Sequence, residues 1–201
     1  MAPLADTYTA FRGTLALASG SLATVATAAH RALAKDPTAV VTVVRHDTGH
    51  TVDLDLRGTE AEVAQRHAVP DAPPAAEGAD TSRPRGRGRP RLGVVAREVT
   101  LLPEHWDWLA SQAGGASVAL RKLVLQAMRD SAGPDALRRA RERTYAFMST
   151  MAGDLPGFEE ATRALFAGDA NGLAAHIAAW PPDLRHLVAR LAQPQAQGEA
   201  A

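Results

Sequence analysis

The chain has 201 residues, 46% of them hydrophobic and only 4% aromatic, and its 22 basic and 22 acidic residues give no net charge. This length allows one domain or two small ones, and the low aromatic content predicts helix-rich units with thin cores. The absence of cysteine excludes disulfides and thiolate metal sites. No window resembles a signal peptide or a membrane span, so we expect no membrane partner and a cytoplasmic location.

Residues 1–67 predict a small α/β domain. A hairpin is expected from Tyr8, then a helix capped by Ser21, then a β-branched strand around residues 39–46. Residues 50–58 alternate, which predicts a second strand with Val52, Leu54 and Leu56 on one face. Thr59 and Glu62 have capping-box spacing for a following short helix.

Residues 68–92 are dominated by Pro, Ala, Gly and Arg and show no apolar period, which predicts a disordered linker. The charge of this region is uneven, because six arginines and no acid lie between Thr81 and Arg97. Such a local patch determines what a polyanion encounters, although the whole chain is neutral.

Residues 93–132 predict a strand, a helix and a second helix. The strand is β-branched and ends before Pro103, which suits the first turn of a helix, with Glu104 at its N-terminal end. Gly114 and Gly115 end this helix, and Ser117 is expected to cap the next one. Gly133 and Pro134 are expected to stop the second helix.

Residues 133–192 predict a helical domain, in which Asp169 and Pro181 are start signals, and residues 193–201 predict a disordered tail. The fold class expected from the whole chain is therefore α+β in several parts. These parts are a small α/β unit, a basic linker, a strand–helix–helix unit and a helical segment.

The strand–helix–helix order resembles the ribbon–helix–helix family of DNA-binding proteins. The motif residues that match are Thr100, Leu102, Pro103, Glu104, Gly115, Ser117, Arg121, Leu123 and Val124. The resemblance implies a homodimer whose paired strands enter the major groove, with base-facing positions that fall on Arg97, Val99 and Leu101. Thr100, on the opposite face of the strand, is a further candidate contact. The resemblance also implies that backbone N–H groups of Ser117 and Val118 hold a phosphate.

The two faces of this strand differ in chemistry. One face carries Arg97 and Val99, and the other carries Glu98 and Thr100, so a shift of one residue exchanges the groups that meet the bases. Glu98 repels phosphates but can accept a hydrogen bond from a cytosine amine. The alternative interpretation is a strand–helix–helix that serves dimerisation alone.

The basic run resembles an AT-hook, whose core is an Arg-Gly-Arg-Pro sequence. The expected DNA contacts in this run are Arg85, Arg87, Gly88, Arg89, Pro90 and Arg91. Glycine lets the backbone approach the floor of the minor groove, and arginines favour the negative potential of a narrow A·T-rich groove. The alternative interpretation is a flexible Arg-Gly linker with weak affinity for any nucleic acid.

The rest of the chain offers little enzyme chemistry. It contains no nucleophile-elbow motif, no P-loop and no dinucleotide-binding glycine motif after a strand. The histidines lack a known metal-ligand spacing, so no metal and no cofactor are expected. Stretches from all parts of the chain resemble one bacterial family, domain of unknown function 2239. This resemblance supports the division into parts but gives no information on activity.

The sequence therefore predicts a DNA-binding homodimer that favours A·T-rich sites. It would act as a transcriptional regulator or a nucleoid-associated factor and not as an enzyme. The second hypothesis is an antitoxin-like module whose helices bind a partner protein.

Overall fold

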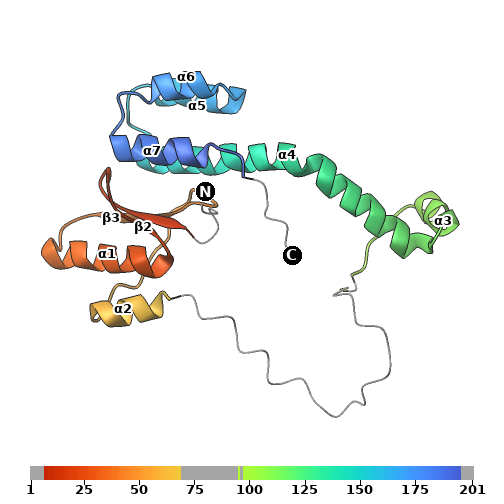
Figure 1. The fold of residues 1–201 in the computed structure, drawn as a ribbon, viewed down its shortest axis with the longest axis horizontal. Helices are drawn as coiled ribbons and strands as arrows, with labels where there is room; N and C mark the ends of the chain where they lie inside the picture. Colours follow the sequence, from red (N-terminus) through yellow and green to blue (C-terminus); the bar gives the residue numbers. More distant parts are fainter. Residues whose placement is uncertain (1–6, 69–94, 96, 196–201) are drawn as a thin grey trace, which may run out of the picture. The chain divides into compact units, whose positions relative to one another are not determined.

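A computed structural model describes residues 7–68, 95 and 97–195 of the chain, and its mixed α+β architecture is shown in Figure 1. The predicted hairpin is present as β1 (Tyr8–Arg12) and β2 (Leu15–Gly20), and β3 (Val41–Arg45) pairs with the other side of β1. The result is an antiparallel sheet in the order β2-β1-β3.

Two helices of the N-terminal region begin where the sequence predicts. Ser21 caps α1 (Leu22–Lys35) by accepting a hydrogen bond from the backbone N–H of Thr24. Thr59 and Glu62 form the predicted capping box of α2 (Glu60–Arg66), because each side chain accepts from the other residue's backbone N–H. Both signals are local, which explains why they could be identified without a fold.

The second strand predicted over residues 50–58 is wrong. Only Thr51 forms a bridge, with Val44, and the following residues lie in irregular structure. The predicted apolar face is nevertheless partly used, since Val52 and Leu54 pack on the cluster beneath the sheet. The alternating pattern therefore reflects the burial of alternate side chains, although these residues form no continuous ladder of hydrogen bonds.

The C-terminal region is helical, as predicted, with α5 (Phe158–Ala167), α6 (Ala170–His176) and α7 (Pro182–Leu191) following the long α4 (Gly115–Met151). Asp169 caps α6 by accepting from the N–H of Gly172. The predicted stop at Gly133 and Pro134 is wrong, because α4 continues through Pro134. Residues around this proline are exposed, so water can satisfy the carbonyl group that proline leaves unbonded.

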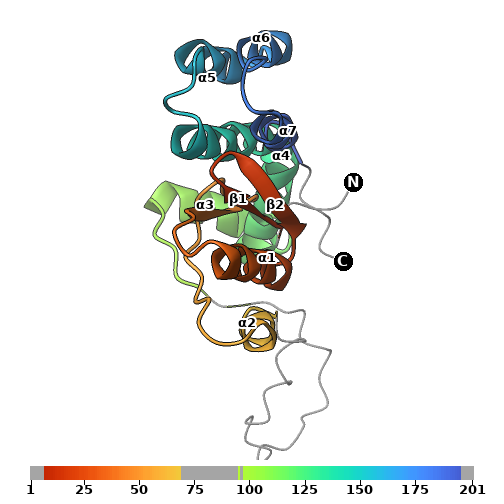
Figure 2. The same cartoon turned by 90° about the vertical axis from the view of Figure 1, so that its left-hand side faces the viewer.

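The sheet lies between α1 and the C-terminal helices (Figures 1 and 2). Tyr8 and Ala10 pack with Val25 of α1, whereas the alternate residue Phe11 joins the core of the C-terminal helices. Alternation along one strand thus supplies two separate hydrophobic clusters, one on each face of the sheet.

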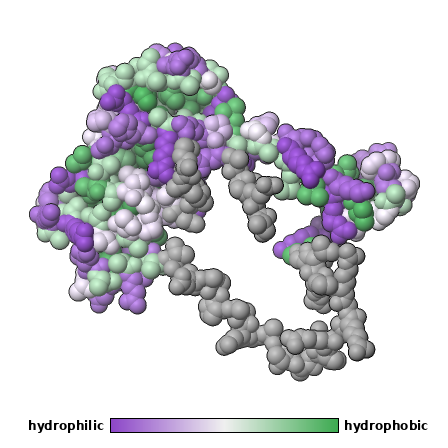
Figure 3. Space-filling model, viewed as in Figure 1, coloured by the Kyte–Doolittle hydropathy of each residue, from purple (hydrophilic) through white to green (hydrophobic). Residues whose placement is uncertain are grey.

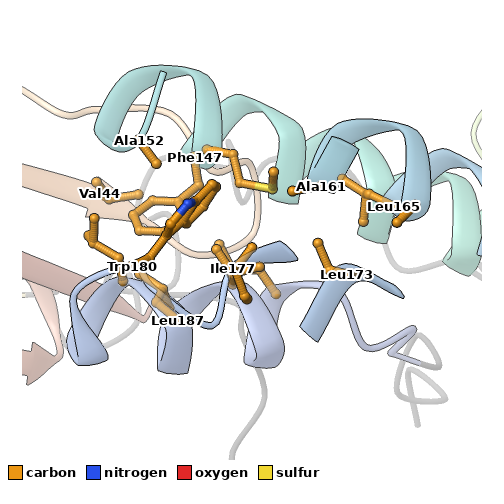
Figure 4. Close-up of a cluster of buried hydrophobic side chains, with 14 of the residues drawn as sticks. Val44, Phe147, Ala152, Ala161, Leu165, Leu173, Ile177, Trp180 and Leu187 are labelled. Carbon is orange, nitrogen blue, oxygen red and sulfur yellow. The ribbon is translucent and has the colours of Figure 1, made fainter. Parts of the chain in front are cut away.

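The larger cluster joins both ends of the chain. Phe11 and Val44 from the sheet pack with buried side chains of α4 to α7, as Figure 4 shows for Val44, Phe147 and Trp180. The sequence analysis placed residues 1–67 and 133–192 in separate domains. In the structure, the described parts of Met1–Val69 and Ala132–Ala201 form one compact unit, and the described parts of Pro70–Ser131 form a second.

Arg143 of α4 connects this helix to the residues that end and follow α7. The buried Arg143 side chain donates through Nε to the carbonyl of Leu191 at 2.8 Å and through a terminal nitrogen to that of Gln193 at 2.5 Å. Gln193, the first residue of the predicted tail, is therefore held. Burial lowers the pKa of Arg143, although a guanidinium remains charged.

Within the described part of the chain, no helix is both long enough and apolar enough to cross a membrane.

Candidate nucleic-acid interface

The first helix of the predicted DNA-binding unit is present as α3 (Pro103–Ser111). Pro103 occupies the first turn, where a missing N–H costs nothing, and Glu104 lies near the positive end of the helix dipole. Leu102 precedes the helix with an extended backbone. The proline and the glutamate at the start of α3 are two of the motif residues on which the resemblance to the ribbon–helix–helix family is based.

A glycine turn joins α3 to α4. Gly114 and Gly115 have φ values of 91° and 73°, which only glycine adopts readily. The helix starts at Gly115, so the prediction of Ser117 as its cap is wrong. Ser117 and Val118 instead lie in the first turn, where backbone N–H groups have no carbonyl partner within the helix. Their contact with a phosphate stays a prediction.

The predicted strand before α3 is not formed in the single chain. Residues 97–102 have no regular structure, and Arg97, Glu98, Val99 and Thr100 are all exposed. A strand requires hydrogen bonds to a neighbouring strand, and the described residues of one chain supply none here. Because both faces of the segment are exposed, Arg97 and Thr100 are equally accessible to a ligand.

Hydrophobic exposure is the most unusual property of this unit, and hydrophobic (green) side chains are visible on its surface in Figure 3. Among its described residues, the buried hydrophobic side chains are Leu109 and Ala119. The large exposed ones are Val95, Val99, Leu102, Trp106, Trp108, Leu123, Val124, Leu125 and Met128. A unit with so small a core leaves much of its apolar surface unburied.

Most of the exposed α4 residues lie on one stripe. Leu123, Val124 and Met128 follow helical spacing, with the half-buried Leu120 one turn earlier. On α3, Leu102 and Trp106 are one turn apart, and the buried Leu109 follows them. The single chain leaves these stripes without a partner among its described residues.

The arm residues Arg85, Arg87, Gly88, Arg89, Pro90 and Arg91 lie outside the described residues, so their contacts stay a prediction. The structure adds two basic residues that the sequence analysis did not select, namely Lys122 and Arg129 on exposed positions of α4. The signal for them was a helix whose first half carries three basic residues and a single acid, Asp130.

The described residues contain no group of three or more His, Asp or Glu side chains that could hold a metal ion. Asp55, which lies near His50 in the sequence, forms an ion pair with Arg57 at 2.9 Å. Hydrogen bonds from Arg57 hold the pKa of the Asp55 carboxyl well below its ordinary value.

The chain belongs to a family of bacterial proteins, described as "Uncharacterized protein conserved in bacteria" (DUF2239), whose model matches residues 7–192. The matched segment runs through both compact units and includes the arginine arm. Comparison with the curated proteins and with the solved structures returns no match.

Proposed function

We propose that this protein is a homodimeric DNA-binding protein of the bacterial cytoplasm that favours A·T-rich sites. The observation that carries the proposal is the apolar surface of α3 and α4, which is left uncovered by the described residues. In a ribbon–helix–helix arrangement, a second copy covers this surface and supplies the partner strand for residues 97–102. The segment that is irregular in one chain would then become ordered in two.

Charge supports a role in DNA binding. Six arginines between residues 81 and 97 lead into the proposed ribbon, and the exposed Lys122 and Arg129 follow it on α4. The ribbon would enter the major groove, and Arg87 and Arg89 would enter an adjacent A·T-rich minor groove. Such a protein would act as a transcriptional regulator or as a nucleoid-associated factor.

Glu98 favours a second candidate function. It is exposed in the segment that would face DNA, and a carboxylate there repels phosphates. In the second candidate, the strand–helix–helix serves dimerisation or binds a partner protein, as in antitoxin-like modules. DNA contact would then depend on the arginine arm alone.

A salt-titrated anisotropy assay on A·T-rich and G·C-rich duplexes tests the proposal. We expect the double variant Arg87→Ala, Arg89→Ala to lose more than about tenfold in affinity and to lose its A·T preference, and we expect its salt slope to fall by about 2. Arg97→Ala tests the ribbon separately from the arm. If the ribbon contacts DNA, this variant is expected to lower the affinity for both duplexes.

The matched control removes two exposed arginines from the other compact unit, Arg57→Ala with Arg163→Ala. It changes net charge equally and is expected to leave binding within about twofold of the unmodified protein. Failure of the intact protein to bind either duplex at low salt would refute the DNA proposal, and a dimer without DNA affinity would favour the second candidate.

A further inference from the structure

A small pocket lies between the sheet and α7, within the compact unit that joins the two ends of the chain. Its floor contains the apolar side chains of Phe11 and Leu187. Its polar lining comes from both sides, with Thr9 and Ser19 on the strands and Asp183, His186 and Arg190 on the helix. A few polar groups converging over an apolar floor are typical of a small-molecule site.

The strand side of the pocket carries an ordered chain of hydrogen bonds. Thr9 Oγ1 donates to Ser19 Oγ at 3.1 Å and lies 2.7 Å from Nε2 of the buried His46. Because the hydroxyl proton of Thr9 is used toward Ser19, His46 donates to Thr9 through Nε2. The hydroxyl proton of Ser19 is then left to donate to a molecule in the pocket.

The helix side supplies a guanidinium that is not paired with an acid among the described residues. Arg190 is half-buried and has neither a hydrogen bond nor an ion pair among the described residues. It is close enough to His46 to contribute, after burial, to lowering the pKa of that imidazole to about 4. Asp183 also lines the pocket, and its Oδ2 accepts from the N–H of Ala16 at 2.8 Å, which ties this carboxyl group to the start of β2 and not to Arg190.

We propose that this pocket binds a small 2-hydroxy acid, whose carboxylate pairs with Arg190 and whose neighbouring oxygen accepts a hydrogen bond from Ser19. A guanidinium presents parallel N–H donors that match a carboxylate. The pocket volume of about 180 Å³ is well above the roughly 15 Å³ that a single water needs, so a ligand of a few heavy atoms can enter. This site does not depend on the DNA-binding proposal.

Three probes of nearly equal size separate the two contacts. Glycolate carries both the carboxylate and the hydroxyl, glycolamide lacks the charge, and acetate lacks the hydroxyl. Titration of the full isotope-labelled chain, followed by NMR, measures each dissociation constant. We expect glycolate to bind at millimolar concentration or below and at least about tenfold more tightly than glycolamide. Acetate is expected to bind between them.

Two variants assign the contacts to residues. Arg190→Gln is expected to lower the affinity for glycolate at least about tenfold. Arg190→Lys keeps the charge and is expected to lower this affinity less. Ser19→Ala is expected to lower the affinity for glycolate and to leave the affinity for acetate unchanged. Arg185→Gln on the same helix is the control, since Arg185 does not line the pocket.

The proposal is overturned if glycolate shifts no resonance of residues 9–19 or 183–190 at about 50 mM, far above a millimolar dissociation constant. Equal binding of glycolate and glycolamide would also overturn it, as would an Arg190→Gln variant that keeps its fold and binds like the unmodified chain.

Discussion

At the scale of single residues, Gly49 is the position where substitution meets the least space. A Cβ atom built there would lie 1.8 Å from the carbonyl oxygen of Arg143, and its φ of 74° disfavours every other residue. We expect Gly49→Ala to lower the free energy of unfolding by more than about 2 kcal/mol, since a steric clash adds to the cost of a left-handed backbone. Urea denaturation measures this change.

Gly13 provides the matched control for that experiment. It also has a positive φ, of 59°, but no atom lies within 4 Å of a Cβ built on it. Gly13→Ala should therefore lower the free energy of unfolding only by the cost of a left-handed backbone, about 1 kcal/mol. Equal losses in the two variants would show that the approach of Gly49 to α4 contributes nothing to stability.

His46 makes stability depend on pH. Burial is the main cause that lowers its pKa from 6.5 to about 4, so the unfolded chain binds a proton more readily than the folded one. Stability is therefore complete above pH 6.5 and falls as pH decreases toward 4, by at most about 3 kcal/mol. His46→Gln should flatten this part of the pH profile of urea unfolding, and an unchanged slope would contradict the assignment.

Residue-scale features were predictable where their partners are close in sequence. The caps formed by Ser21, Thr59 and Asp169 each bond a backbone group three residues away, so the sequence contains the whole interaction. Gly49 and His46 could not be interpreted in this way. Gly49 faces Arg143, and His46 bonds Thr9, so the reason for each lies far away in the chain.

At the scale of elements, α4 shows that a break signal can be overridden. Its flanks are rich in Ala, Leu and Arg, which favour a helix strongly enough to extend it through Gly133 and Pro134. We expect Pro134→Ala to raise the free energy of unfolding by about 1–3 kcal/mol, because it restores one backbone hydrogen bond and removes a steric conflict. Chemical denaturation monitored by far-UV circular dichroism measures the gain.

Gly133→Ala is the companion variant at the neighbouring position. No atom lies within 4 Å of a Cβ built there, so only helix propensity should change, by roughly 1 kcal/mol. A Pro134→Ala variant less stable than the unmodified chain would mean that the proline is required by the packing around it.

The strand elements divide in an instructive way. The paired strands β1, β2 and β3 were predictable because β-branched and alternating residues stand next to turn residues. Residues 50–58 and 97–102 have the same pattern but form no strand in the single chain. Pattern alone specifies which side chains are buried, whereas a strand also requires an available edge.

At the scale of the whole molecule, the exposed stripe of α4 predicts association. We expect Val124→Glu to convert a dimer into a monomer of 21.1 kDa, because it places a charge within the apolar surface that a second copy would cover. Light scattering after size exclusion measures the mass. Gln126→Glu, which adds the same charge on another face of α4, should leave the dimer intact.

A monomeric unmodified chain would contradict this prediction at concentrations up to about 100 μM, well above the dissociation constants of stable dimers. It would also remove the second strand that the proposed ribbon needs. The arginine arm would then be the remaining basis for DNA binding.

The shared core has a consequence for how the protein is made. Phe11 and Val44 are packed by residues of α7, so translation of nearly the whole chain must precede completion of this core. A nascent chain that has emerged only through residue 131 would expose one face of its sheet, and a chaperone could bind there. The Pro70–Ser131 segment, which contributes apolar helical residues, is therefore synthesised before Met1–Val69 and Ala132–Ala201 can form their shared core.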